Sequence, residues 1–164
     1  SALDGKYNSE LYKMWSSKGF LTLTDSETTD YNYIQNQIVY LYETFDVQGV
    51  FFDSWNAQML VNNLTNLGLP MTAYSQSIGN FNKPTKEMER LVLSDKVRFD
   101  NNPITRFCFD NVELKVDING NSKPVGDHNA KKIDGVISML NALGGYLSIV
   151  YGNQEAFVLP YKNS

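Results

Sequence analysis

One short segment constrains the fold more than any other: the apolar run Val50-Phe51-Phe52, followed by Asp53 and then by a helical pattern. Because the run does not alternate, it predicts a strand covered on both faces, as in an open α/β sheet. In such sheets, functional side chains collect at the carboxyl ends of the strands. Asp53 is therefore either a cap for the following helix, whose free N–H groups would donate to its oxygens, or a site residue. Position alone leaves both roles open.

Composition limits the classes of protein that remain. The chain has 164 residues, and its hydrophobic content of 42% suffices for the core of one domain. A net charge of −4 excludes a basic clamp whose affinity for nucleic acid comes from overall charge. The single cysteine, Cys108, excludes an internal disulfide and a zinc cluster, and it predicts a core thiol in a reducing compartment. The sequence shows no signal peptide and no apolar run of transmembrane length, so it predicts an intracellular protein without a membrane partner.

Periodicity and turn residues predict the other elements. Helices are expected before Gly19, after Asp30, before Gly68, from Pro84, from Pro103, and from about Lys131 to Gly144-Gly145. Short strands are expected at residues 20–24, 70–74 and 97–99. Strict alternation from Val112 to Ile118 leads into Asn119-Gly120, which predicts a β-hairpin with a type I′ turn. This order predicts one α/β domain over residues 1–145 and a C-terminal tail over residues 146–164.

Two acids and a histidine are candidates for chemistry. Asp134 lies near the start of the last predicted helix, off its apolar stripe, where the helix dipole favours an ionised acid. If that helix packs beside the strand ending at Asp53, the two carboxylates could share Mg²⁺ or Mn²⁺; otherwise they are unrelated surface acids. His128, the only histidine, is either an inert exposed side chain or a general base beside a metal. Lys131 and Lys132 are either a solvated pair or a phosphate contact.

Six segments, in order, resemble the C-terminal nuclease region of the large terminase subunit of tailed double-stranded DNA bacteriophages. Residues 49–57 resemble its strand-Asp-Ser-Trp-Asn-Ala segment, and residues 132–136 read Lys-Ile-Asp-Gly-Val, like its signature. The other four segments are similar to its Ser-Gln-Ser loop, its Pro-x-Lys-Glu-x-Glu-Arg-Leu helix, its Asn-Pro segment and its Asp-x-x-Gly-Asn-x-Lys-Pro hairpin; they occupy residues 68–77, 84–91, 101–111 and 117–124. The resemblance covers most of the chain.

The resemblance implies an α/β, ribonuclease H-like mixed sheet flanked by helices, with an added β-hairpin. It also implies a metal-dependent endonuclease that cuts concatemeric phage DNA when packaging starts and ends. The family's acids carry over to Asp53 and Asp134, as ligands of two Mg²⁺ or Mn²⁺ ions, and His128 completes the predicted catalytic set. The implied partners are double-stranded DNA, the portal protein, the small terminase subunit and the protein's own ATPase domain, in the cytoplasm of the bacterial host.

The chain departs from the family at its beginning. The first catalytic acid of the family lies on an opening strand, whereas Asp4 precedes a predicted helix and Asp25 and Asp30 lie in a predicted turn and cap. We therefore expect a partial nuclease domain without its N-terminal strands and without the ATPase domain. Two other interpretations stay open. One is a catalytically incomplete interaction module that docks on the portal or other terminase parts, and the other is an α/β domain unrelated to nucleic acid.

Overall fold

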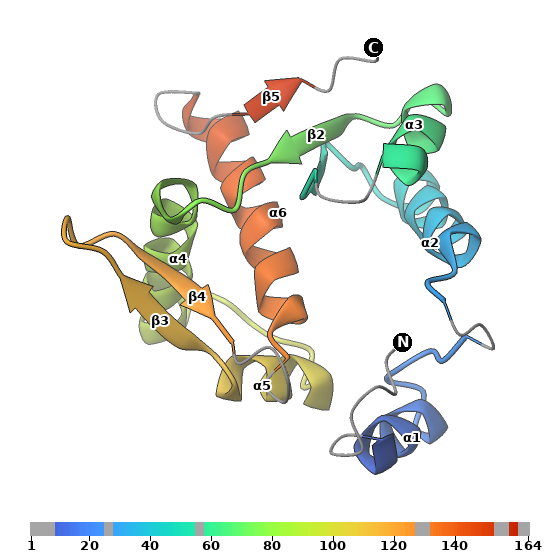
Figure 1. The fold of residues 1–164 in the computed structure, drawn as a ribbon, viewed down its shortest axis with the longest axis horizontal. Coiled ribbons are helices and arrows are strands. Elements are labelled where there is room, and N and C mark those ends of the chain that lie inside the picture. Colours follow the sequence, from blue (N-terminus) through green and yellow to red (C-terminus); the bar gives the residue numbers. More distant parts are fainter. Residues whose placement is uncertain (1–8, 25–27, 55–57, 127–131, 153–157, 161–164) are drawn as a thin grey trace.

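The computed structural model describes residues 9–24, 28–54, 58–126, 132–152 and 158–160. Figure 1 shows their arrangement as helices around a small sheet, with a hairpin projecting from one side. The elements in chain order are α1 (Ser9–Ser17), α2 (Tyr31–Thr44), β1 (Val50–Phe52), α3 (Gln58–Asn66), β2 (Met71–Tyr74), α4 (Ile78–Leu93), α5 (Pro103–Asp110), β3 (Glu113–Val116), β4 (Ser122–Val125), α6 (Asp134–Tyr151) and β5 (Val158–Pro160). None of the described helices is both long and apolar enough to cross a bilayer.

Three strands form a mixed sheet in the order β1-β2-β5, while β3 and β4 form a separate two-stranded ribbon. β1 runs parallel to β2, with Val50 opposite Met71, and β5 runs antiparallel along the other edge of β2. Because α3 connects β1 to β2, the centre of the chain is a strand–helix–strand unit. The predicted α/β class and the added hairpin are confirmed.

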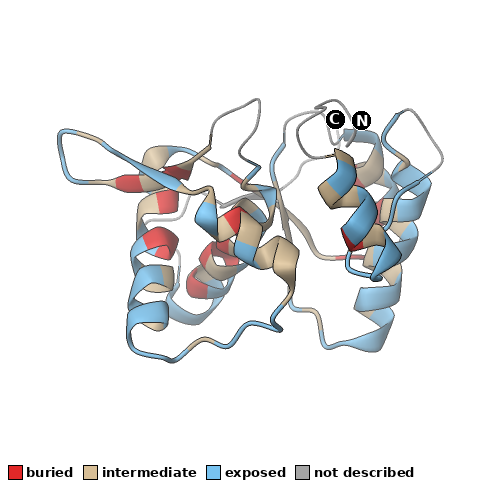
Figure 2. Ribbon diagram, turned by 90° about the horizontal axis from the view of Figure 1, so that it is seen from below, coloured by how far each residue is buried: buried red, intermediate tan, exposed pale blue. Residues whose placement is uncertain are grey.

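The core lies where α4, α5 and α6 meet β2. Its buried cluster consists of Tyr74, Phe81, Cys108, Val136 and Leu140. Figure 2 shows that such buried positions gather on the inward faces of the helices, while the outward faces are exposed. The prediction that Cys108 is a core residue is confirmed, because its side chain is buried in this cluster.

The start of α4 differs from the prediction. The helix begins at Ile78, after the cap Ser77, and Pro84 lies within it rather than at its first turn. A proline inside a helix cannot donate to the carbonyl four residues earlier, here that of Asn80. The Tyr74 hydroxyl donates to this carbonyl oxygen instead, at 3.1 Å. The prediction is wrong because the compensating hydrogen bond comes from β2, which the local sequence does not show.

The last helix also differs. The predicted start at about Lys131 falls on a residue outside the described ranges, and α6 begins at Asp134. The predicted end at Gly144-Gly145 is wrong, because α6 continues through both glycines to Tyr151. Here the glycines serve close packing, since a Cβ at either position would overlap the ring of Tyr74 or Phe51. The predicted domain boundary at residue 145 thus falls inside α6, and β5, in the predicted tail, pairs with β2.

The hairpin pairs as predicted, but its turn is different. Leu114 faces Pro124 and Lys115 faces Lys123 across the ladder. A type I′ turn needs a positive φ at both central residues. Gly120 has φ +77, whereas Asn119 is not among the described residues with positive φ. The Asp117 carboxylate accepts the backbone N–H groups of Asn119 and Asn121, both at 2.9 Å, so these bonds shape the loop.

Four further predictions have mixed outcomes. Asp30 caps α2 as predicted, and its carboxylate accepts the backbone N–H of Tyr33 at 2.9 Å. Residues 20–24 and 97–99 join neither described sheet, so the strands predicted there are wrong. The apolar face of α2 is only partly covered, since Ile34 and Ile38 are half-buried, whereas Leu41 is 47% exposed and Phe45, the C-cap, is 62% exposed. Alternating or apolar residues alone do not make a strand when no neighbouring strand offers a hydrogen-bonding edge.

Candidate functional site

Asp53 directly follows β1 and is exposed, at the carboxyl end of a strand that is anchored on both sides. Pairing with β2 fixes the backbone as far as Phe52. The Phe51 ring packs against Gly145 of α6 and meets the Tyr74 ring edge-to-face, with 6.3 Å between the ring centroids. The backbone that leads to Asp53 is therefore held in place by both the sheet and α6. Residues 55–57 of the predicted segment lie outside the described ranges.

Asp134 is the first residue of α6, and it is exposed. The helix cap is Ile133, which offers no side-chain hydrogen bond to the first turn. The N–H groups at a helix start that lack partners create a positive potential, which stabilises a nearby carboxylate. Asp134 is thus placed at the positive end of α6, where its carboxylate can reach solvent or a ligand.

Two residues at the end of α5 hold the start of α6. The N–H groups of Gly135 and Val136 donate to the Cys108 sulfur, and a Cβ at Gly135 would lie 3.2 Å from that sulfur. Burial raises the pKa of the Cys108 thiol and the charge of Asp134 acts in the same direction, although the two N–H groups oppose them. The Asn111 side-chain amide donates to the carbonyl of Lys132 at 3.3 Å.

Sequence reasoning misses this support. The sequence predicts Cys108 as a core residue but indicates neither its contact with α6 nor a role for Asn111. One signal was available: a glycine directly after Asp134 indicates a close approach of another group to the helix start. In the structure, that group is the Cys108 sulfur.

The predicted acids lie on elements that pack together, whereas His128 and Lys131 fall outside the described residues. Lys132 is exposed. Within the described parts of the chain, no group of three or more Asp, Glu, His or Cys side chains could hold a metal ion. The oxygens of Asp53 and Asp134 are hard donors of the kind that Mg²⁺ and Mn²⁺ prefer, so they fit such an ion as part of a ligand set.

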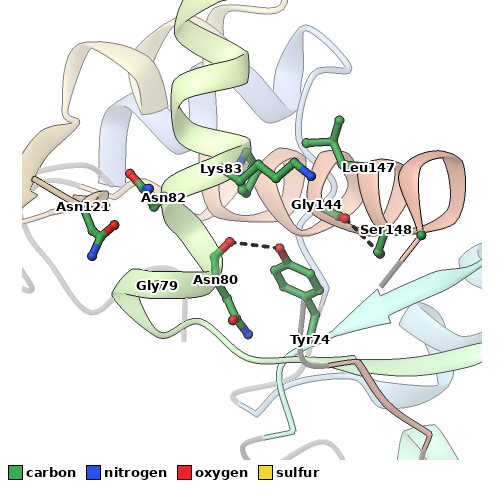
Figure 3. A pocket seen from close by; sticks show the side chains of 11 residues that line it. Tyr74, Gly79, Asn80, Asn82, Lys83, Asn121, Gly144, Leu147 and Ser148 are labelled. Carbon is green, nitrogen blue, oxygen red and sulfur yellow. Dashed lines mark hydrogen bonds between the residues drawn. The ribbon is translucent and has the colours of Figure 1, made fainter. Parts of the chain in front are cut away.

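A polar pocket lies at the other end of α6. Its volume is about 330 Å³, and Figure 3 shows amide, ammonium and hydroxyl groups around it, from Asn80, Asn82, Lys83, Asn121 and Ser148. No acid, histidine or cysteine is among the residues that line it. Because Mg²⁺ and Mn²⁺ bind mainly through carboxylate oxygens, which this pocket lacks, it is not the metal site that the sequence predicts.

The chain is similar in sequence to a family of known proteins. Residues 4–148 match the family model for the terminase large subunit, endonuclease domain. Over 144 residues the chain is 31% identical to Protein YmfN of Escherichia coli (strain K12), covering 86% of this chain and 31% of that protein. Over 135 residues it is 25% identical to the terminase large subunit of Enterobacteria phage HK97, covering 81% and 27%. The chain thus spans less than a third of the length of either relative.

The fold has a solved counterpart. The crystal structure of the HK97 bacteriophage large terminase matches with a TM-score of 0.74 and 25% identity, over 82% of this chain and 28% of that one. This match confirms the ribonuclease H-like fold class. Sequence and structure lead to the same assignment: the chain belongs to the family of terminase large subunit endonuclease domains.

Proposed function

We propose that this chain is the nuclease part of a packaging terminase, which cuts concatemeric double-stranded phage DNA with the aid of Mg²⁺ or Mn²⁺. The observation that carries the proposal is the placement of two acids. Asp53 ends β1 and Asp134 begins α6, and these elements pack together in a chain of an endonuclease family. Functional groups of α/β folds collect at such strand ends.

Packing of β1 on α6 supports a shared site. Asp53 lies two residues beyond Phe51, whose ring packs on Gly145, and Asp134 begins the same helix. Both acids thus lie at the ends of elements that contact each other, and the proposal requires their carboxylates to converge on one metal site.

Each residue would have a distinct role. The metal ions, when bound, would help to ionise the attacking water and stabilise the leaving oxygen during phosphodiester hydrolysis. Asp53 would hold its ligand oxygen at the end of β1, and Asp134 would present its carboxylate at the start of α6. Cys108 and Asn111 would position Asp134 by fixing that first turn. We propose His128 as a general base near the site.

A third carboxylate would complete the ligand set. Among the described strands, β1 pairs only with β2, so its other edge can accept a further strand. We propose that such a strand, with an additional acid, comes from another part of a longer polypeptide. The partners would be double-stranded DNA, the portal protein, the small terminase subunit and the ATPase domain, in the cytoplasm of the bacterial host.

One observation favours a second candidate function. The described residues contain no metal-holding group of three or more acids, histidines or cysteines. A chain with only two of the required ligands loses both affinity and geometry for the metal. It would then act as an interaction module, docking on the portal or on other terminase parts without cutting DNA.

Thermal melts with and without Mn²⁺ test the proposed site. At ten times its dissociation constant, a bound ion stabilises the fold by about 1.4 kcal/mol, which corresponds to roughly 3–5 °C for a chain of this size. We expect Mn²⁺ to raise the melting temperature of the wild type and not that of Asp134→Asn or Asp53→Asn. Without Mn²⁺, Asp134→Asn should cost at most about 1 kcal/mol, since Asp134 is exposed and its charge acts only through the dipole at the start of α6.

The matched control is Asp110→Asn, because Asp110 is an exposed acid whose carboxylate lies 3.9 Å from Arg106, on the same helix as Cys108. This variant should keep the full Mn²⁺ response. An equal Mn²⁺ shift in the wild type and Asp134→Asn would rule out a ligand role for Asp134. A wild type that does not respond to Mn²⁺ would favour the interaction module.

A further inference from the structure

The first helix, α1, is attached to the domain through one tryptophan. Among the nine residues of α1, only Trp15 is buried, with a relative exposure of 4%. A helix of this length is not stable in water on its own, so α1 depends on this contact. Gly19, with φ +77, follows the helix, and the N–H of Phe20 donates to the Trp15 carbonyl at 2.9 Å. Figure 1 shows α1 apart from the sheet, with α5 as the neighbouring helix.

The ring of Trp15 packs on α5. Its centroid lies 5.2 Å from that of Phe107, and the two ring planes meet edge-to-face at 68°, which is a preferred geometry for aromatic pairs. Tyr12 also packs on Trp15, with 5.7 Å between the ring centroids. Phe107 in turn packs against the buried core cluster, to which Trp15 does not belong. Trp15 therefore acts on the rest of the domain through the position of Phe107.

Phe107 lies on the face of α5 that supports the start of α6. Because successive helical residues are about 100° apart, Phe107, Cys108 and Asn111 fall within an arc of about 100°. The Cys108 sulfur accepts the N–H groups of the two residues that follow Asp134. The Asn111 side-chain amide donates to the carbonyl of Lys132 at 3.3 Å. One turn of α5 thus connects α1 to the helix start on which Asp134 lies.

We propose that Trp15 is a positioning residue for the metal site, which holds this turn of α5 against the start of α6 and thereby fixes Asp134. The inference rests on the proposed function, since it takes Asp134 as a metal ligand. α1 has nine residues and α5 has eight, so each helix depends on its packing partners. Without the indole ring, the turn of α5 would shift and the first turn of α6 would follow it. Groups that orient a metal ligand affect metal affinity without touching the metal.

A second aromatic pair on α5 provides a comparison. The rings of Phe99 and Phe109 meet at 65° with 5.1 Å between their centroids, which is nearly the geometry of the Trp15 pair. Phe109, however, lies about 160° around the helix from Asn111, so it is outside the face that supports α6. Phe99 is also 41% exposed, whereas Trp15 is buried. Loss of the Phe99 ring should therefore remove a similar contact from α5 without releasing the start of α6.

Titration with Mn²⁺, at a temperature where every variant is folded, separates positioning from a contribution to stability alone. We expect Trp15→Leu to weaken Mn²⁺ binding about ten-fold, the lower end of the effect of residues that orient a metal ligand. Trp15→Phe keeps a ring against Phe107 and should stay within about two-fold of the wild type. The matched control, Phe99→Leu, should bind Mn²⁺ like the wild type.

Phe107→Leu tests the same contact from the side of α5, and it replaces Trp15→Leu if that variant does not fold. Where both fold, the double variant should bind Mn²⁺ no more weakly than the weaker single variant, since both changes act through one contact. Amide resonances of the metal-free chain give a second readout. The N–H groups of Gly135 and Val136 bond to the Cys108 sulfur, so we expect Trp15→Leu to shift both resonances and Phe99→Leu to shift neither.

Each result decides the inference. Unchanged Mn²⁺ affinity in the folded Trp15 and Phe107 variants, or unchanged Gly135 and Val136 resonances, would overturn the positioning role. An equal loss of affinity in Phe99→Leu would do the same, because the effect would then not depend on the supporting face of α5. If Asp134→Asn abolishes Mn²⁺ binding while Trp15→Leu retains it in full, the proposed site stands and only this inference fails. A wild type that binds no Mn²⁺ would refute the proposed site and, with it, the role of Trp15.

Discussion

Gly145→Ala is expected to destabilise the fold by about 2–3 kcal/mol, although alanine is the better helix former by about 1 kcal/mol. The physical reason is the packing of α6 on β1, because the added methyl group would overlap the ring of Phe51. The strand and helix would have to separate, which disturbs the contact that holds the backbone before Asp53. Chemical denaturation should detect this loss, and the melting temperature should fall by roughly 5–10 °C.

Gly79→Ala is the matched control. Gly79 also lies in a helix, and a Cβ there would meet no atom within 4 Å. This variant should be as stable as the wild type or slightly more stable. If Gly145→Ala behaves like Gly79→Ala, the close packing of α6 on β1 is wrong. Combining Gly145→Ala with Phe51→Leu should recover part of the loss, since the two positions are in contact and their effects should not add.

Gly144 and Gly145 also show which features the local sequence cannot predict. A Gly-Gly pair after an apolar stripe is a common helix stop, and the local sequence contains nothing that contradicts this interpretation. Only the positions of Phe51 and Tyr74, on strands far away in the sequence, explain why α6 continues. Pro84 is a second example. It cannot donate to the Asn80 carbonyl, and the Tyr74 hydroxyl of β2 donates to this carbonyl instead. Tertiary contacts decide both cases.

Elements specified by local chemistry were predictable. The Asp30 cap and the alternation of β3 act within a few residues, so the sequence contains all of the interacting groups. For the candidate site, the sequence identified Asp53 and Asp134 with their strand end and helix start. It could not identify Cys108 and Asn111 as the support of Asp134, because those contacts join α5 to α6 across more than twenty residues.

The largest functional effect is expected from Asp53→Asn. It can be measured in a hybrid in which residues 4–148 of this chain replace the matching segment of the HK97 large terminase, so that the remaining parts come from that protein. Loss of residues that only orient a metal ligand costs about 10- to 100-fold. Removal of the charge of a ligand itself should therefore reduce Mn²⁺-dependent cleavage of plasmid DNA by at least about 100-fold.

The matched control is Asp46→Asn, which removes an exposed carboxylate from the chain that enters β1 rather than from its carboxyl end. Cleavage by this variant should equal that of the unmodified hybrid. If Asp53→Asn and Asp46→Asn cut at the same rate, Asp53 takes no part in the reaction and the proposed site is wrong. Removing a negative charge near DNA should leave DNA binding unchanged or make it stronger. A reduced cleavage rate for Asp53→Asn without weaker DNA binding would therefore place its effect on the chemical step.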